Sequence, residues 1–375
     1  MNAPSQNAPG TRVVAVDALR GVAATMVMAF HYSTRFGQLH GPWPGLGFTF
    51  EGGRLGVQLF FMISGFVIFM TLDRAQHPSE FLVSRFSRLF PVFWVAVLLT
   101  GGVELSLHLL GQQYGWSTVL LNLLMVQGLL QVPDIDGAYW TLQVEVLFYV
   151  CMLGLWLFSG FANFRRLLAV WLSLALVKVC LPAVLGLRVP NVVNEFLVLD
   201  YIPWFGMGMI LFMRGQSTRN AFDLALYALA LLCVALGNPV HVTLVTIGFS
   251  VVLTLAVRRP PRLLLARPLV WMGAISYPFY LVHENLGYSV MLAAAKWGAT
   301  PWVSVVCAVV MAFLLAWTLH VLIEKPAMAG IRSWYRRRFP AERRALSMSG
   351  RSRWRVGLAL AVLLLLIGDR LALMR

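Results

Sequence analysis

The sequence predicts an all-α integral membrane protein, and two observations point to this class. Of its 375 residues, 59% are hydrophobic and only 12% are charged, whereas soluble domains carry about 25% charged residues. Long apolar segments also recur along the chain, each close to the roughly 20 residues that a helix needs to cross a bilayer. A soluble chain of this length buries only about three quarters of its surface, so it could not hide so much apolar area.

The expected membrane spans follow these apolar segments in order. They are residues 13–33, 55–72, 86–110, 139–158, 166–187, 194–213, 222–236, 240–257, 269–292, 302–323 and 356–373. A shorter apolar piece, 118–131, is ambiguous by length. If it does not cross, the arginine-rich loops all fall on one side, which the positive-inside rule makes the cytoplasm. We therefore expect 118–131 to be a re-entrant or outer-surface segment.

This topology gives a ten-helix transmembrane core and one additional C-terminal transmembrane helix, in the inner or plasma membrane with a cytoplasmic N-terminus. The expected divisions are a disordered tail at 1–12, a transmembrane domain at 13–326, a basic cytoplasmic segment at 327–355 and the extra helix at 356–373. The net charge of +15 is concentrated in the cytoplasmic loops, so we expect a lipid-bilayer partner and no nucleic acid. The four cysteines lie singly inside apolar runs, which predicts neither a disulfide framework nor a metal site.

Ionisable side chains inside spans are costly, and they commonly mark functional sites. Arg20 and His31 are eleven residues apart on the first span, which puts them on one helical face about 16 Å apart along the axis. By their depth in their own spans, Glu145 and His283 fall in the same outer layer as His31. The sequence thus predicts that these last three side chains can meet.

Arg85 and Arg88 are three residues apart near the cytoplasmic surface, where two guanidinium groups on one helical face suit phosphate groups. Arg20 lies deeper on the same side and would extend this positive track into the bilayer. Simpler interpretations stay open: the Arg85 pair as positive-inside anchors, Asp17 and Arg20 as an intrahelical pair, and His283 as an interhelical hydrogen-bond donor. Three further ionisable residues are either packing partners or pore-lining groups: Glu104, Lys178 and Asp200.

Six short motifs, in order, resemble those of the membrane acyltransferase-3 family. Residues 16–21 with Phe30 and His31 are similar to the first-span motif, because Arg20 and His31 keep its Arg-x10-His spacing. Residues 85–91 are similar to the family's Arg-x-x-Arg loop. The other four blocks resemble the second-span motif, the Trp-x-Leu-x-x-Glu block and the last two motifs of the family: residues 56–66, 140–145, 276–283 and 323–326.

The resemblance implies transfer of an acyl group, usually acetyl, from acyl-CoA to a hydroxyl of a glycan, lipid-linked sugar or similar acceptor. Acyl-CoA is then a co-substrate, and no cofactor is bound permanently. Arg20, Arg85 and Arg88 would hold the anionic donor. His31 would act as general base or as a transient acyl carrier, and Glu145 would orient His31 or hold the acceptor. His283 is the remaining catalytic candidate.

The chain departs from the family pattern at three positions. Gln58, Val146 and Lys325 stand where the family commonly has Asp, a second Glu and Arg. The alternative function is a multispanning transporter of a polar or anionic solute, but the two related halves typical of transporters are not evident in the sequence. The sequence identifies neither the acceptor nor the acyl chain.

Overall fold

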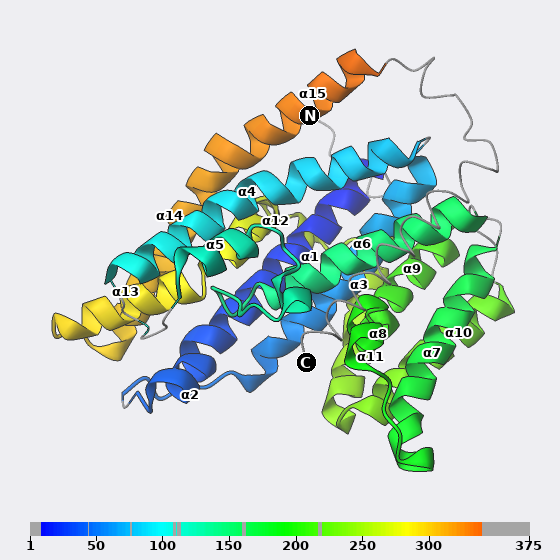
Figure 1. Cartoon of the computed structure of the whole chain (residues 1–375), viewed down its shortest axis with the longest axis horizontal. Helices are drawn as coiled ribbons and strands as arrows, with labels where there is room; N and C mark the ends of the chain where they lie inside the picture. The colour runs from blue at the N-terminus through cyan, green and yellow to red at the C-terminus, as the bar shows by residue number, and fades with distance from the viewer. Residues whose placement is uncertain are drawn as a thin grey trace.

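The computed structural model describes residues 9–43, 45–75, 77–107, 110, 114–159, 163–216 and 220–339, and within these ranges it contains helices and no strands (Figure 1). The elements are α1 (Pro9–Phe30), the π-helix η1 (His31–Arg35), α2 (Phe36–His40), the 3₁₀-helix η2 (Glu51–Leu55), α3 (Gly56–Arg74), α4 (Pro78–Leu107), α5 (Trp116–Asn122), the 3₁₀-helix η3 (Gln127–Leu130), α6 (Trp140–Ser159), α7 (Phe164–Leu185), α8 (Asn191–Phe196), α9 (Ile202–Gln216), α10 (Ala221–Gly237), α11 (Val240–Arg258), the 3₁₀-helix η4 (Arg262–Leu265), α12 (Arg267–Val282), α13 (Asn285–Lys296), α14 (Pro301–Leu319), the π-helix η5 (His320–Glu324) and α15 (Lys325–Arg338).

Seven of the described helical segments are long and apolar enough to cross a membrane: Val14–His40, Glu51–Arg74, Pro78–Leu107, Trp140–Leu157, Phe164–Leu185, Val240–Arg258 and Pro301–Arg338. They confirm a multi-pass all-α membrane protein, but not the expected count of ten core spans. Helix α1 begins at Pro9, inside the expected tail. The rest of that tail, residues 1–8, and the expected helix at 356–373 lie outside the described residues.

Two expected spans are broken in the structure, and a third is an unbroken but short helix. The segment 269–292 is divided into α12 and α13, because the chain leaves helical geometry at His283 and Glu284. The segment 194–213 contains the short α8 and the 15-residue α9, and 222–236 becomes the 17-residue α10. The average hydropathy of a segment does not reveal a break in the helix, since a few polar residues barely change the average.

The ambiguous piece 118–131 forms no helix long enough to cross the membrane. It contains the end of the seven-residue α5 and the four-residue η3. Both are far shorter than the roughly 20 residues required. Its position at the outer surface stays a prediction.

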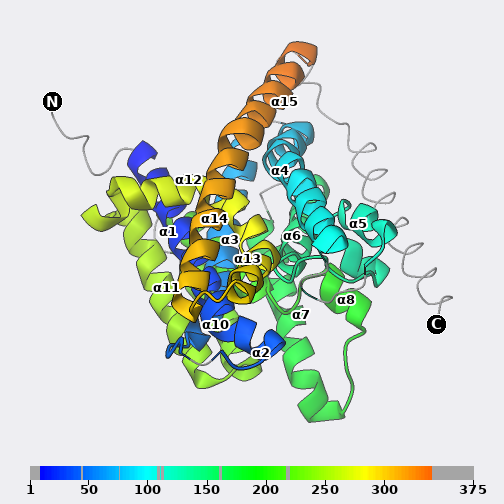
Figure 2. The same cartoon turned by 90° about the vertical axis from the view of Figure 1, so that its left-hand side faces the viewer.

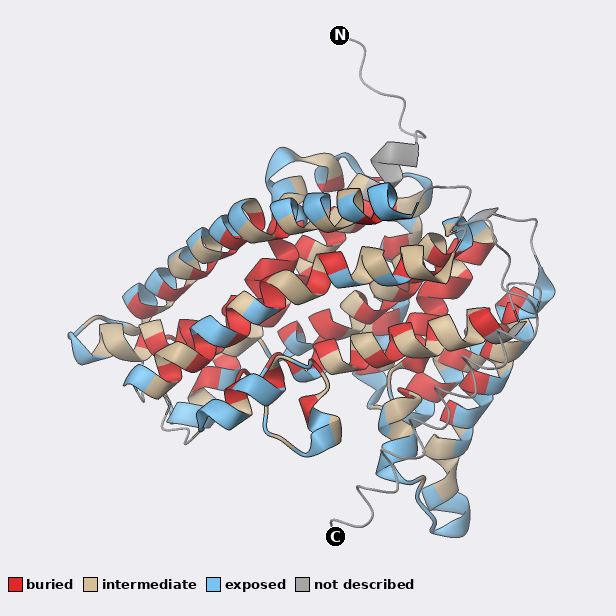
Figure 3. Cartoon of the chain, turned by 45° about the horizontal axis from the view of Figure 1, so that its top comes forward, coloured by how far each residue is buried: buried red, intermediate tan, exposed pale blue. Residues whose placement is uncertain are grey.

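Two pairs of helices approach each other through glycines. A Cβ at Gly273 of α12 would lie 2.3 Å from the Asp17 carbonyl oxygen of α1, and one at Gly21 would lie 2.8 Å from the Gly273 nitrogen. In the same way, Gly65 of α3 and Gly208 of α9 each face the backbone of the other helix. Small residues permit such close packing in membranes. Buried residues accordingly concentrate on the central helices (Figure 3).

Helix α14 continues through η5 into α15, which lies beside α4 and projects past the other helices (Figures 1 and 2). The continuous segment Pro301–Arg338 has 38 residues. At 1.5 Å per residue it is about 57 Å long, well beyond the ~30 Å hydrocarbon core. Because the segment is longer than the core, we expect the end of α15, with Arg336, Arg337 and Arg338, to extend out of the bilayer. It forms the first part of the expected basic segment, whose residues 340–355 are not described.

Candidate active site

His31 lies where α1 changes into a π-helix. Residues His31–Arg35 form the π turn η1, which then continues into α2. A π turn accommodates one extra residue and is frequent at functional sites, because it rotates the side chains that follow. The packing of Gly21 against Gly273 brings the same helix against α12, at whose end His283 lies.

The structure brings His31 and His283 into direct contact. His31 Nδ1 lies 2.8 Å from His283 Nε2, and the two rings are nearly parallel. His283 Nδ1 lies 2.8 Å from the carbonyl oxygen of Tyr280. A carbonyl only accepts, so His283 carries its proton on Nδ1 and its Nε2 accepts from His31 Nδ1. In this arrangement of neutral rings, the Nε2 of His31 has a free lone pair and can act as a base.

Tyrosine hydroxyls fix the backbone around this histidine pair. Tyr32 donates to the His283 carbonyl oxygen at 2.5 Å, and Tyr288 donates to the His31 carbonyl oxygen at 3.4 Å. Tyr139 donates to the Leu281 carbonyl oxygen at 3.2 Å. His283 is fully buried, whereas the His31 side chain is 12% exposed. Of the two rings, His31 is therefore the one that a substrate can reach.

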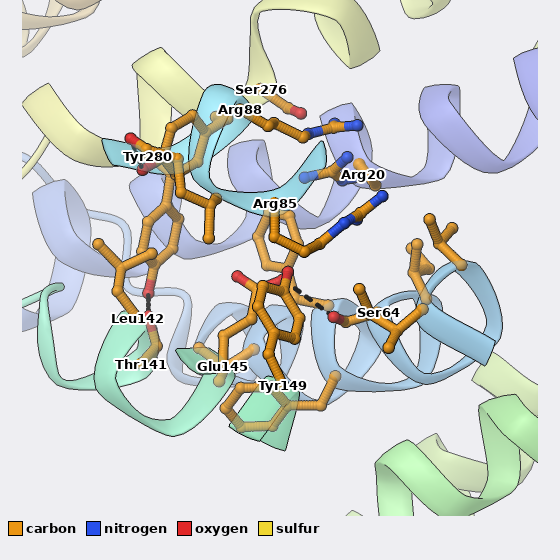
Figure 4. A pocket seen from close by; sticks show the side chains of 18 residues that line it. Arg20, Ser64, Arg85, Arg88, Thr141, Leu142, Glu145, Tyr149, Ser276 and Tyr280 are labelled. Carbon is orange, nitrogen blue, oxygen red and sulfur yellow. Dashed lines mark hydrogen bonds between the residues drawn. The ribbon is translucent and has the colours of Figure 1, made fainter. Parts of the chain in front are cut away.

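A narrow pocket of about 60 Å³ contains the predicted arginines (Figure 4). Arg20 enters it from α1, and Arg85 and Arg88 enter it from α4. The far end of the pocket is lined by Tyr280, whose ring centroid lies 5.4 Å from that of His283. Tyr280 thus links the pocket to the histidine pair, although neither His31 nor His283 lines the pocket itself.

Glu145 lies in this pocket and not beside His31, so the expectation that His31, Glu145 and His283 meet is wrong for Glu145. Its carboxylate accepts hydrogen bonds from Ser64, at 2.9 Å, and from Tyr149 (Figure 4). Within the described part of the chain, no hydrogen bond or ion pair joins it to either histidine. Depth along a span places a residue at a height in the membrane, but not on the correct side of its helix.

A wider cavity of about 540 Å³ shares Val67, Arg85 and Arg88 with the narrow pocket. It is also lined by Arg74 and by Arg332 of α15, which donates to Ser87 at 3.3 Å. Among the described residues, none of the arginines that line the two cavities forms an ion pair: Arg20, Arg74, Arg85, Arg88 and Arg332. Only two carboxylates line the same cavities, Asp17 and Glu145, and such an excess of guanidinium groups is suited to an anionic ligand.

The structure shows what the other charged residues contact, for which the sequence left open an intrahelical ion pair, packing partners or pore-lining groups. Asp17 lines the wide cavity and Arg20 the narrow pocket, and in the described residues the two form no ion pair. Lys178 and Asp200 form an ion pair, which Asn194 supports with a hydrogen bond of 2.7 Å to Asp200. Glu104 is buried and accepts from the Leu110 backbone N–H at 3.3 Å, which accounts for it as a packing residue.

Sequence reasoning missed two carboxylates near the histidines. Glu284 Oε2 lies 3.5 Å from His31 Nδ1. Asp136, in the segment before α6, accepts from the backbone N–H groups of Ala138 and Asn285 at 3.0 Å each. Burial raises the pKa of the Asp136 carboxyl to about 7. Both residues lie in turns between helices, and the only signal in the sequence was that Glu284 directly follows His283.

Comparison with known proteins gives one family and several relatives. The profile of the acyltransferase-3 family, described as an acyltransferase domain, matches residues 13–321. The chain is 28% identical to the exopolysaccharide production protein ExoZ of Rhizobium meliloti (strain 1021), over 82% of this chain and 96% of the relative. It is 26% identical to nodulation protein 10 of Rhizobium leguminosarum bv. viciae, over 83% and 92% respectively. It is 25% identical to the acyltransferase MdmB of Streptomyces mycarofaciens, over 74% and 81%. No solved structure matches the chain.

Proposed function

The chain belongs to the acyltransferase-3 family of acyl-transferring enzymes, and on this premise we propose that it is a membrane O-acyltransferase with acyl-CoA as its donor. The acyl group, acetyl in our proposal, passes to a hydroxyl of a glycan or a lipid-linked sugar. The relative in Rhizobium meliloti is named for exopolysaccharide production, which supports a glycan acceptor.

The observation that carries this proposal is that the arginine-lined cavity adjoins the narrow pocket, which is lined by Tyr280 next to the histidine pair. Coenzyme A has phosphates at one end and a long thin arm that ends in the thioester. The wide cavity has room for the phosphates beside Arg74, Arg85, Arg88 and Arg332, and the narrow pocket fits the arm. Arg20 lines the narrow pocket and would hold the inner part of the donor.

Glu145 belongs to donor binding in this scheme. Its carboxylate faces the narrow pocket between Ser64 and Tyr149. The pantetheine arm has amide N–H groups, which are good donors to a carboxylate. We therefore assign Glu145 to holding the arm, and not to orienting His31.

His31 is the general base of the proposed reaction, because its Nε2 is the free acceptor at the end of the hydrogen-bonded chain. It takes the proton from the acceptor hydroxyl while the hydroxyl oxygen attacks the thioester carbonyl carbon. The carbon–sulfur bond then breaks and the protonated His31 returns that proton to the thiolate of coenzyme A. The products are the O-acyl ester and free coenzyme A, so atoms and charges balance.

Mass spectrometry of cell-envelope glycans tests the proposal. Cells that carry the chain should yield glycans with an added acyl mass, about 42 Da for acetyl, and cells with the His31→Ala variant should not. Membranes given radiolabelled acetyl-CoA should transfer label to the same glycan fraction. Identical glycans with and without the chain would contradict the proposal.

A further inference from the structure

Glu284 is a buried carboxylate with one oxygen, Oε2, that accepts no hydrogen bond from the described part of the chain. It lies in the turn between α12 and α13, directly after His283, and is 4% exposed. Its Oε2 has no hydrogen-bond partner within the described part of the chain, yet lies 3.5 Å from His31 Nδ1. A buried carboxylate without partners is costly, so its retention at this place needs a reason.

The surrounding chain is shaped to hold this carboxylate against His31. A Cβ on Gly137 would lie 2.4 Å from Glu284 Oε1 and 2.9 Å from Oε2, so any larger residue there would push the carboxylate out of its present position. The next residue, Asn285, donates its backbone N–H to Asp136 at 3.0 Å and its side-chain amide to the Ile135 carbonyl at 2.7 Å. The segment 135–137 and the turn after α12 therefore lock together around Glu284.

We propose that Glu284 is a positioning residue for His31, one that holds the Nδ1 side of the ring and offsets the positive charge it gains during acyl transfer. The inference rests on the proposed function, in which His31 takes a proton on Nε2. His283 can only share the Nδ1 proton, because it is a neutral ring hydrogen-bonded to Tyr280. Glu284 supplies the negative charge that His283 lacks, and it does so most strongly when His31 is protonated.

Several other groups act on the same carboxylate and have to be considered in any pH experiment. Burial raises the pKa of the Glu284 carboxyl well above its usual value, and the nearby Asp136 and Asp134 raise it further, whereas Arg35 on η1 favours the ionised form. The hydroxyls of Tyr32 and Tyr288 lie in the same cluster. None of them lies within ion-pair distance of His31, so Glu284 is the carboxylate that acts on the ring directly.

The Glu284→Gln variant tests the inference in membranes of the host, with radiolabelled acetyl-CoA as donor and label in the glycan fraction as readout. Glutamine keeps the shape of the side chain but not its charge. We expect kcat to fall on the order of 10- to 100-fold, with KM and equilibrium binding of acetyl-CoA unchanged. Because the carboxylate favours the protonated ring and glutamine does not, the acidic limb of the kcat profile should move to lower pH. The matched control, Glu104→Gln, alters another buried carboxylate and should behave as wild type.

A second pair of variants separates positioning from a general folding defect. Gly137→Ala should displace the Glu284 carboxylate and slow transfer in the parent chain. In a Glu284→Ala background the same substitution has no carboxylate to displace, so it should have little further effect. Additive losses from the two substitutions would contradict the inference.

The outcomes for Glu284 and for the proposed function can be told apart. If His31→Ala is inactive while Glu284→Gln keeps wild-type kcat and an unchanged pH profile, the role of Glu284 is overturned and the base assignment stands. If His31→Ala still transfers label at the wild-type rate, both assignments are overturned. Loss of kcat in both variants, with acetyl-CoA binding retained, supports both.

Discussion

The two ends of α1 carry two polar sites that are built in opposite ways. At the Arg20 end, arginines from α1, α3, α4 and α15 line open cavities, and in the described residues no carboxylate pairs with them. At the His31 end, the two imidazoles form a buried chain of hydrogen bonds that ends on the Tyr280 carbonyl. The first site has more arginines than its two carboxylates, Asp17 and Glu145, can balance, and in the second the two histidines already have their hydrogen-bond partners.

This difference indicates what each site requires from its ligand or substrate. An anionic ligand would offset the excess of positive charge at the arginine end, which is why we propose this end as the donor-binding site. The histidine pair needs no ligand to set its tautomers, so it is preorganised for proton transfer before the substrate arrives. Binding and chemistry can therefore be lost separately, which the following substitutions test in order of expected effect.

His31→Ala should have the largest effect, on transfer alone. Loss of a general base commonly lowers the rate by roughly 10²–10⁴-fold. Binding of acetyl-CoA should persist, because the arginine end of α1 lies about 16 Å from His31 along the helix axis. The measurements are label transfer in membranes and equilibrium binding of acetyl-CoA. His241→Ala, at an exposed position of α11, is the matched control. A well-expressed His31→Ala protein with near-normal transfer would move the chemistry to another group.

Arg85→Ala combined with Arg88→Ala should have the effect that His31→Ala lacks, a loss of donor binding. Hydrogen bonds to charged groups contribute about 1.5–3 kcal/mol each, so we expect at least a roughly 100-fold weaker Kd for acetyl-CoA. Lysine at both positions should restore only part of the affinity, because it lacks the planar fork. Arg258→Ala with Arg259→Ala removes the same charge elsewhere and is the control. Unchanged binding would leave the Arg85 pair as topological anchors.

The two ends of α1 also differ in how much of each could be predicted from the sequence. The apolar segments predicted a helical membrane protein, and the spacing of Arg20 and His31 predicted that one helix links two sites. Arg85 and Arg88 were expected to act with Arg20, and the structure places all three in one pocket. These placements could be predicted because they depend on a single helix or on local charge, and the roles of the four residues stay predictions.

The features that could not be predicted from the sequence depend on packing between distant segments. The side of α6 on which Glu145 lies is fixed by contact with Ser64 of α3, which no periodicity reports. The break at His283 and Glu284 lies inside a segment whose average hydropathy suits an unbroken span. Arg332 is far from Arg88 in the sequence, and only the return of α15 alongside α4 brings the two to the same cavity.

Gly273→Ala should sharpen the comparison by disturbing the contact between α1 and α12. The new Cβ would lie 2.3 Å from the Asp17 carbonyl oxygen, and overpacking of this kind costs about 1–3 kcal/mol. Because α12 carries His283, we expect transfer to fall more than acetyl-CoA binding. Gly248→Ala in α11 has open space around its Cβ and is the control. Equal losses of binding and transfer would mean that the helix contact supports both ends alike.

Asp136→Asn should have the smallest effect, a change in how stability depends on pH. Burial raises the pKa of this carboxyl from its usual 3.8 to about 7, so the folded state holds the proton more tightly than the unfolded chain. The stability that this group contributes is complete below about pH 4 and is lost as the pH rises to about 7. Asparagine cannot ionise, although it leaves one backbone N–H of Ala138 or Asn285 without its acceptor. The variant should therefore melt below wild type at about pH 5 and approach it by about pH 8, as measured on detergent-solubilised protein. Parallel melting curves at every pH would show that the closed histidine end admits enough water to ionise Asp136 freely.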